Sequence, residues 1–168
     1  PDLSPAKRFL SATCKPGADL KLKQRFEQLA PVIITQGFVA RNEAGQTVLL
    51  GRGGSDTSAA LLAGRLQAHE LEIWTDVPGL FSADPRKVPH ARLLAQLGYA
   101  EALEMAASGA KVVHPRCIRA AAHTSTPIVI RDTSRPQLAG TRIAEPAVAS
   151  PEEKKPGVKA ITCQQDML

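Results

Sequence analysis

The chain has 168 residues, of which 43% are hydrophobic and 4% aromatic, and it carries a net charge of +5 at pH 7 with a sequence pI near 9.4. This length is enough for one domain with a buried core, and the hydrophobic fraction is ordinary for a soluble protein. No apolar run approaches the length of a membrane span, and no charged and then apolar leader opens the chain. The composition therefore predicts a soluble, cytoplasmic protein without a membrane partner.

The pattern of charges and cysteines argues against two further classes of protein. Lysines and arginines are scattered, and no aromatic residues alternate with a basic stripe, so nucleic-acid binding lacks its usual pattern. The positive charge suits an anionic ligand without identifying one. Cys14, Cys117 and Cys163 are odd in number and far apart, which indicates reduced thiols rather than a disulfide framework or a zinc site.

The first predicted elements are a helix and two strands. Residues 20–29 have apolar side chains at helical spacing among charges, and the pattern ends at a proline. Residues 32–35 form a continuous β-branched run, which is typical of a strand buried on both faces. A turn over residues 42–45 leads to a second strand at 47–50.

Helices and strands alternate over the rest of the chain. A helix from residue 56 to about residue 69 is followed by a strand at 71–74. After a long loop, helices are expected at 99–108 and 115–123, and a strand at 127–131. This alternation predicts an α/β fold, a three-layer sandwich in which a mostly parallel sheet is covered by helices.

The most informative motif is the sequence Gly-Arg-Gly-Gly-Ser-Asp at residues 51–56, called the glycine turn below. It leaves an apolar strand and opens an alanine-rich helix. Such a turn directs backbone N–H groups and the positive end of the helix dipole at one spot, which favours a phosphate or carboxylate. Gly53 and Gly54 allow a ligand to approach the backbone, and Arg52 adds a guanidinium fork.

The glycine turn differs from two other glycine-rich phosphate-binding motifs. A P-loop needs a lysine and a hydroxyl residue after its last glycine, and the dinucleotide fingerprint needs a small residue where Asp56 stands. Both are therefore excluded. A purely structural turn, capped by Ser55, is the remaining alternative.

Two later segments carry polar residues that suit a nucleotide. Thr75 and Asp76 follow a strand, at the edge where open α/β sheets bind ligands. Asp84 and Arg86 flank a proline that fixes an extended backbone before the guanidinium. A lysine, Lys111, precedes the helix at 115–123, whereas the histidines, including His114, are interpreted as structural.

Three motifs, at residues 51–56, at 74–79 together with 84–86, and at 109–115, follow one another in this order and are preceded by Thr-Gln-Gly-Phe at 35–38. Together they resemble aspartate kinases of the amino-acid kinase family. The resemblance covers residues 32–141. It implies the family's α/β fold and transfer of the γ-phosphoryl group of ATP to the side-chain carboxylate of L-aspartate. The product would be 4-phospho-L-aspartate, in the first step of lysine, threonine and methionine biosynthesis, with Mg²⁺ as the cation.

The resemblance also implies a role for each motif residue. The aspartate would be held by Arg52 and Ser55, with Gly53 and Gly54 lining the reacting groups and Asp56 organising the family's catalytic lysine. Since Asp56 lies near a helix N-terminus, it is expected to stay ionised and to orient rather than donate a proton. The nucleotide would be bound by Thr75, Asp76, Phe81, Asp84, Arg86 and Lys111. The family commonly has tyrosine at the position of Phe81, so stacking is retained and a hydroxyl contact is lost.

The family's Lys-Phe-Gly-Gly and Thr-Asp-Glu motifs have no counterpart here. The resemblance therefore implies a remnant of the substrate half (1–31), the nucleotide-binding half (32–144), a Pro-rich and charged linker (145–157) and the first strand of an ACT regulatory region (158–168). A homo-oligomer is expected for the full-length protein. Two alternatives stay open: a non-catalytic nucleotide-binding or assembly module, and another kinase of the family, such as a glutamate, acetylglutamate or uridylate kinase.

Overall fold

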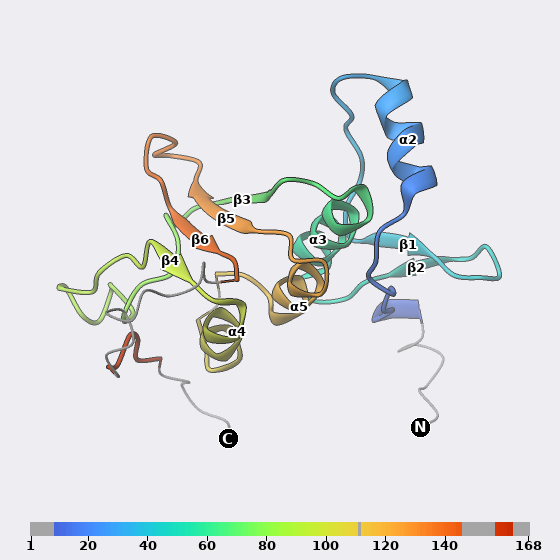
Figure 1. The fold of residues 1–168 in the computed structure, drawn as a ribbon. Coiled ribbons are helices and arrows are strands. Elements are labelled where there is room, and N and C mark those ends of the chain that lie inside the picture. The colour runs from blue at the N-terminus through green and yellow to red at the C-terminus, as the bar shows by residue number, and fades with distance from the viewer. Residues whose placement is uncertain (1–8, 111, 146–156, 163–168) are drawn as a thin grey trace.

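The fold combines a small hairpin, a four-stranded sheet and helices packed beside it (Figure 1). It is seen in a computed structural model, which describes residues 9–110, 112–145 and 157–162. The elements in chain order are α2 (Leu20–Leu29), β1 (Val39–Arg41), β2 (Thr47–Leu49), α3 (Gly54–Leu66), β3 (Leu71–Thr75), β4 (Gln96–Leu97), α4 (Tyr99–Ala107), α5 (Pro115–His123), β5 (Ile128–Asp132) and β6 (Thr141–Ile143).

The larger sheet has the strand order β3-β5-β6-β4. The pairs β3–β5 and β4–β6 are parallel and the pair β5–β6 is antiparallel, so two of the three neighbouring pairs are parallel. In the register of β3 and β5, Thr75 lies opposite Asp132. Because both strands end there, their polar carboxyl ends meet at one edge of the sheet, as expected of a ligand-binding α/β sheet.

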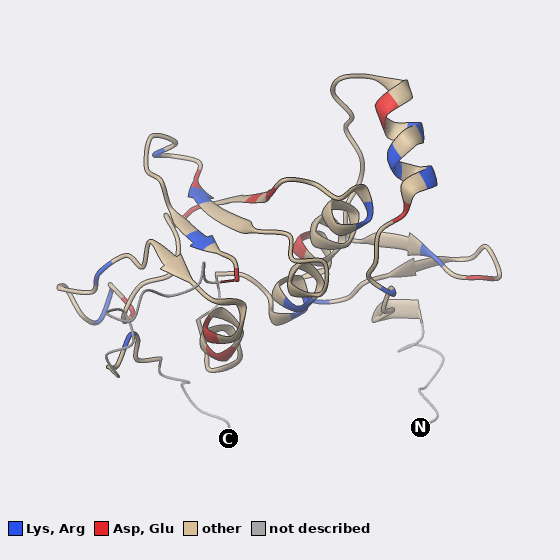
Figure 2. Ribbon diagram, viewed as in Figure 1, with Lys and Arg blue, Asp and Glu red and all other residues tan. Residues whose placement is uncertain are grey.

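One face of this sheet is covered and the other is open in the described part of the chain. Helices α3, α4 and α5 lie on one side of it (Figure 1), where Leu71 and Ile73 are buried. On the other face Arg131 pairs with Glu72 at 2.6 Å and lies over the ring of Trp74. Figure 2 shows acidic residues on β3 and basic residues on β5 and β6. The α/β fold is thus confirmed, and the described helices supply one of the two helical layers expected.

The hydrophobic core lies between the sheet and α3, α4 and α5. Its largest fully buried side chains include Ile118, Ile128 and Ile130, and each such side chain stabilises the fold by roughly 1.5–3 kcal/mol. Ala60 and Ala121 are fully buried where α3 and α5 pack together. Small residues at that contact let the two helices approach closely.

The prediction of a buried strand at residues 32–35 is wrong. These residues form no strand, and Val32 and Ile34 are 77% and 94% exposed. The strand in this region is β1, which pairs with β2 so that Val39 lies opposite Leu49. A strand buried on both faces needs neighbours on each face, and the described residues supply none to 32–35. The short strands β1, β4 and β6 were not predicted.

The other predicted elements form with small shifts of their bounds. The helices α2 and α5 begin and end where the sequence placed them, whereas α3 begins at Gly54 rather than at residue 56. The apolar side of α2 has no buried residue. The strand expected from residue 158 onward is not formed over the described residues 157–162, although Ile161 N–H donates to Ser82 O. None of the described helices has the length and apolar character needed to cross a membrane.

Candidate functional site

The glycine turn joins β2 to α3 through two glycines with left-handed backbone angles. Gly51 has φ +74° and Gly53 has φ +65°. The N–H of Gly54 donates to Gly51 O at 2.9 Å, which closes the turn and starts the helix. The turn and Phe38 line an open hollow of about 530 Å³. The structure therefore brings residues 51–56 together around one concave surface.

The groups at this hollow suit an anionic ligand. Arg52 and Ser55 are exposed, and Asp56 is half-buried in the first turn of α3. In the described part of the chain, the backbone N–H groups of Ser55 and Asp56 have no hydrogen-bond partner. A guanidinium, a hydroxyl and two free N–H donors are the groups that bind carboxylates and phosphates. The individual roles of these residues stay predictions.

The space beside the two inner glycines is taken by the protein itself. A Cβ atom at Gly53 would lie 2.3 Å from His114 Cγ, and one at Gly54 would lie 2.5 Å from Phe38 Cδ2. These glycines are therefore required by packing, in addition to any approach of a ligand. The alternative that Ser55 caps the helix is wrong, because Gly53 is the N-cap and no side chain caps it.

A second helix begins beside the glycine turn. His114 is the N-cap of α5, and its Nδ1 accepts from the N–H of Arg116 at 3.2 Å. The starts of α3 and α5 touch at Gly53 and His114, and their far ends touch at Gly64 and Thr124. The two helices are consequently parallel, and both N-termini lie at the glycine turn. Their dipoles add, which makes this region favourable for negative charge.

Two titratable groups sit in this region. The pKa of His114 is lowered, first by burial and then by the nearby positive charge of Arg116, while Asp56 opposes the shift. Burial, and next the charge of Asp56, raise the pKa of the Cys117 thiol to about 12. Cys117 therefore stays protonated at neutral pH and is not a nucleophile.

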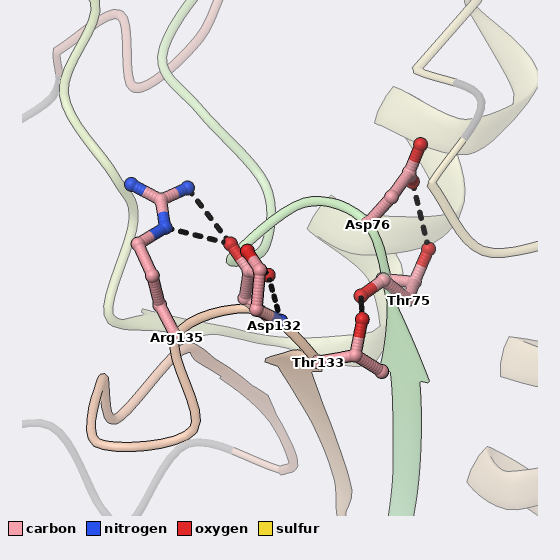
Figure 3. A network of polar contacts seen from close by, with 6 residues as sticks. Thr75, Asp76, Asp132, Thr133 and Arg135 are labelled. Atoms are coloured by element: carbon pink, nitrogen blue, oxygen red, sulfur yellow. Dashed lines mark hydrogen bonds and ion pairs between the residues drawn. The ribbon is translucent and has the colours of Figure 1, made fainter.

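The predicted nucleotide residues Thr75 and Asp76 lie at the carboxyl end of β3, beside the end of β5 (Figure 3). The backbone of Thr75 is held by its neighbour strand, because Thr133 donates to Thr75 O through both its N–H at 2.9 Å and its hydroxyl at 3.0 Å. The Thr75 hydroxyl donates to Asp76 Oδ1 at 3.2 Å. The Asp76 side chain is exposed, so it is available to a ligand.

Sequence reasoning missed Asp132, which is fully buried at the same edge. Its carboxylate accepts from the Ser134 hydroxyl at 2.6 Å and pairs with Arg135 at 2.8 Å (Figure 3). The Ser134 hydroxyl is the main cause that lowers the pKa of Asp132, and Arg135 adds to it. The sequence did contain one signal for Asp132, which is its position at the end of a predicted strand. Where such a strand is the parallel neighbour of β3, its last residue lies beside Thr75.

The remaining nucleotide residues lie in a loop. Phe81 is half-buried and forms an isolated bridge with Leu93, whereas Asp84 and Arg86 are exposed. Asp84 Oδ1 accepts from the N–H of Arg86 at 3.0 Å. Lys111 lies outside the described residues. No hydrogen bond or ion pair within residues 9–110, 112–145 and 157–162 joins this loop to the glycine turn.

Neither region offers a ready-made metal site. Over the described ranges, no group of three or more His, Cys, Asp or Glu side chains is placed to hold a metal ion. A hard cation such as Mg²⁺ commonly keeps several waters and is bound largely through substrate phosphates. The site chemistry is therefore compatible with a cation that arrives with a phosphate ligand.

Comparison with known proteins identifies related chains. A profile of the amino acid kinase family matches residues 8–132. The bifunctional aspartokinase/homoserine dehydrogenase of Buchnera aphidicola is 50% identical over 114 residues, which are 68% of this chain and 14% of that protein. Lysine-sensitive aspartokinase 3 of Escherichia coli is 45% identical over 112 residues, or 67% of this chain and 25% of that protein.

A solved structure gives the same result. The crystal structure of aspartokinase III of E. coli in complex with aspartate and ADP matches with a TM-score of 0.67 and 37% identity, over 84% of this chain and 34% of that one. These comparisons confirm the resemblance drawn from the sequence motifs. The chain spans 14% and 25% of the length of the two curated relatives named above.

Proposed function

The chain belongs to the amino acid kinase family, and on that premise we propose that it is the nucleotide-binding part of an aspartate kinase. The reaction transfers the γ-phosphoryl group of ATP to the side-chain carboxylate of L-aspartate and gives 4-phospho-L-aspartate and ADP. The observation that carries the proposal is the glycine turn, where the N-termini of two parallel helices meet beside an open hollow.

The glycine turn suits the acceptor substrate. The exposed guanidinium of Arg52 can hold a carboxylate through two parallel hydrogen bonds, and the Ser55 hydroxyl and N–H add further donors. Gly53 and Gly54 are proposed to line the reacting groups with their backbone, and a Cβ atom on either would collide with His114 or Phe38. Asp56, in the first turn of α3, is proposed to orient the cationic group that neutralises the transferred phosphoryl group.

The reaction requires neutralisation of negative charge on the two substrates rather than a strong base. A carboxylate oxygen of aspartate attacks the γ-phosphorus, and the bond between that phosphorus and the bridging oxygen of ADP breaks. Since two anions must approach each other, positioning and positive charge supply most of the catalysis. The two helix N-termini and Arg52 provide such charge at the glycine turn.

The edge of β3 and β5 suits the nucleotide. Thr75 and Asp76 are proposed to bind the nucleoside, Phe81 to stack on it, and Asp84, Arg86 and Lys111 to act on the phosphates. Aspartokinase III of E. coli was solved with aspartate and ADP, which supports both substrates for this chain. Mg²⁺ is proposed to arrive with the ATP phosphates. The cytoplasmic location and a homo-oligomeric full-length protein stay predictions.

The division of the chain is part of the proposal. Residues 1–31 are assigned to the end of the substrate half, 32–144 to the nucleotide-binding half, 145–157 to a linker and 158–168 to the start of an ACT regulatory region. The helix α2 has no buried residue, which supports a boundary near residue 31.

The test is hydroxamate trapping of the acyl phosphate, made from aspartate and ATP by the polypeptide as its gene encodes it. Arg52→Lys should raise KM for aspartate at least about tenfold and leave KM for ATP nearly unchanged, because an ammonium cannot replace a bidentate fork. Asp56→Asn should lower kcat by a larger factor than it changes KM for aspartate or for ATP. Arg92→Lys, at an exposed arginine in a loop outside the hollow, is the matched control.

The outcomes separate the proposal from its alternatives. Nucleotide binding without acyl phosphate formation would overturn the kinase assignment and favour a non-catalytic module. Phosphorylation of another acceptor, with aspartate inert, would favour another kinase of the family. An unchanged KM for aspartate in Arg52→Lys would refute the assignment of that side chain to the substrate.

A further inference from the structure

The first turn of α5 contacts the glycine turn at two separate places. At the first, the imidazole of His114 lies against Gly53, at the position that a side chain of residue 53 would occupy. Gly53 has φ +65°, so its backbone is held in a conformation that few residues adopt. The ring thus backs the N-cap of α3 while it caps α5 itself through the N–H of Arg116.

The second contact is made by the side chain of Arg116. One guanidinium nitrogen donates to Leu50 O, the carbonyl directly before the glycine turn, and the other donates to Ala12 O at 2.6 Å. This half-buried cation is therefore occupied by two backbone carbonyls from segments far apart in the chain. The two contacts come from two separate nitrogens of one planar group with fixed donor directions, whereas all three donors of a lysine ammonium sit on a single nitrogen.

These contacts fix the backbone groups that face the hollow. Leu50 precedes the glycine turn, and Gly53 is followed by the N–H groups of Ser55 and Asp56, which have no hydrogen-bond partner among the described residues. Contacts directly before the turn, at Leu50, and inside it, at Gly53, leave those donors little freedom to move. Donors that are fixed before a ligand arrives bind it with a smaller loss of entropy.

We propose that His114 and Arg116 are positioning residues, which hold the glycine turn from α5 and set the donor geometry for the acceptor carboxylate. This inference rests on the proposed function for its substrate, but the mechanical part concerns the chain alone. The proposed role connects two separate parts of the sequence, because the start of α5, which follows Lys111, shapes the site formed by residues 51–56.

The histidine makes the arrangement sensitive to pH. Nδ1 accepts a hydrogen bond, so it carries no proton, and protonation of the ring at that atom removes the cap. The charged groups that act on the ring are Arg116 of α5, Asp56 of α3 and Arg52 of the turn.

The mechanical part is tested by following the backbone amide signals of Gly53 and Gly54 in ¹⁵N–¹H spectra of the full chain, from pH 7.5 to 5. In the wild type these signals should shift together with the His114 ring. In His114→Asn, which keeps a capping oxygen but does not titrate, the shift should vanish. His123→Asn, at the exposed end of α5, is the control and should retain it. Signals that titrate equally in His114→Asn would overturn the role of His114.

The substrate part is tested by kinetics of the polypeptide as its gene encodes it. Arg116→Lys should raise KM for aspartate roughly tenfold, since a single nitrogen does not reproduce the positions of the two guanidinium nitrogens that bond Leu50 O and Ala12 O. KM for ATP should change little even if the unfolding midpoint falls, and Arg119→Lys, an exposed neighbour on α5, should change nothing. Equal changes in both KM values together with a lower unfolding midpoint would mean that Arg116 only stabilises the fold. A wild type that phosphorylates no carboxylate would refute the proposed function, while the amide signals would still decide whether α5 holds the turn.

Discussion

The glycine turn and the loop around residues 81–86 both carry residues expected to bind substrate, yet they are built differently. The glycine turn is held by side chains from distant parts of the chain, namely Phe38, His114 and Arg116. In the loop, the bond between Arg86 N–H and Asp84 is local, and both side chains are exposed. The first site has a shape fixed by contacts across the fold, whereas the second presents exposed charged side chains on residues bonded within the segment 84–88. Substitutions should therefore affect stability at the turn and ligand affinity in the loop.

The largest effect is expected from Gly53→Ala. The new methyl group would collide with the His114 ring, and a positive φ is unfavourable for alanine, so the free energy of unfolding should fall by roughly 2–4 kcal/mol. Gly45→Ala is the matched control, because Gly45 has φ +76° but open space around it, and should cost only about 1 kcal/mol. Urea unfolding measures both. Equal losses would mean that the contact with His114 contributes nothing.

A smaller loss is expected from Thr57→Val. The Thr57 side chain is 4% exposed, and its hydroxyl donates to Gly53 O at 2.7 Å. Valine keeps the volume and removes the hydrogen bond, which should lower the free energy of unfolding by about 1 kcal/mol. Thr57→Ser keeps the hydroxyl and serves as comparison. If the valine variant were as stable as the wild type, the turn would not depend on this bond.

The next effect is a pH dependence. Burial lowers the pKa of His114 below its ordinary value of 6.5, so below pH 6.5 the unfolded chain takes up a proton that the folded chain resists. Stability contributed by the neutral ring is therefore complete above pH 6.5 and is lost as the pH falls towards the lowered pKa. The unfolding free energy of His114→Asn should fall less over this interval. Parallel curves for the two proteins would contradict the assignment.

The smallest effect on stability is expected in the loop. Arg86→Ala should change the free energy of unfolding by less than about 0.5 kcal/mol, because the side chain is exposed. It should nevertheless weaken ATP binding and leave adenosine binding unchanged, and added salt should narrow the difference. Calorimetry with the two ligands measures this. Equal weakening for both would place Arg86 away from the phosphates.

The same contrast explains what the sequence could predict. Helix positions followed from local signals: α5 begins at a proline and α2 has apolar residues at helical spacing, and both have the predicted bounds. The glycine turn was found because its chemistry is contiguous in sequence. The residues that hold the turn, His114 and Arg116, were not found from the sequence. They are more than 50 residues away from it, and nothing in their own surroundings in the sequence indicates what they contact.

The failure at residues 32–35 has a related cause. A β-branched apolar run predicts burial, but burial depends on what other segments supply. Within the described residues nothing packs on Val32 or Ile34, so the run is exposed and the strand forms later, at β1. Asp132 was missed for the opposite reason: its burial comes from the pairing of β5 with β3 and from Ser134 and Arg135.

The single tryptophan of the chain gives the molecule an optical reporter of its own. Trp74 directly precedes Thr75, is 46% exposed, donates from Nε1 to Glu72 at 3.0 Å and has the Arg131 guanidinium 5.8 Å from its ring. Indole emission responds to nearby charge and to water. Ligand contacts at Thr75 and Asp76 that shift the end of β3 should thus alter the fluorescence, so that nucleotide binding to the unlabelled chain can be followed by titration in a cuvette.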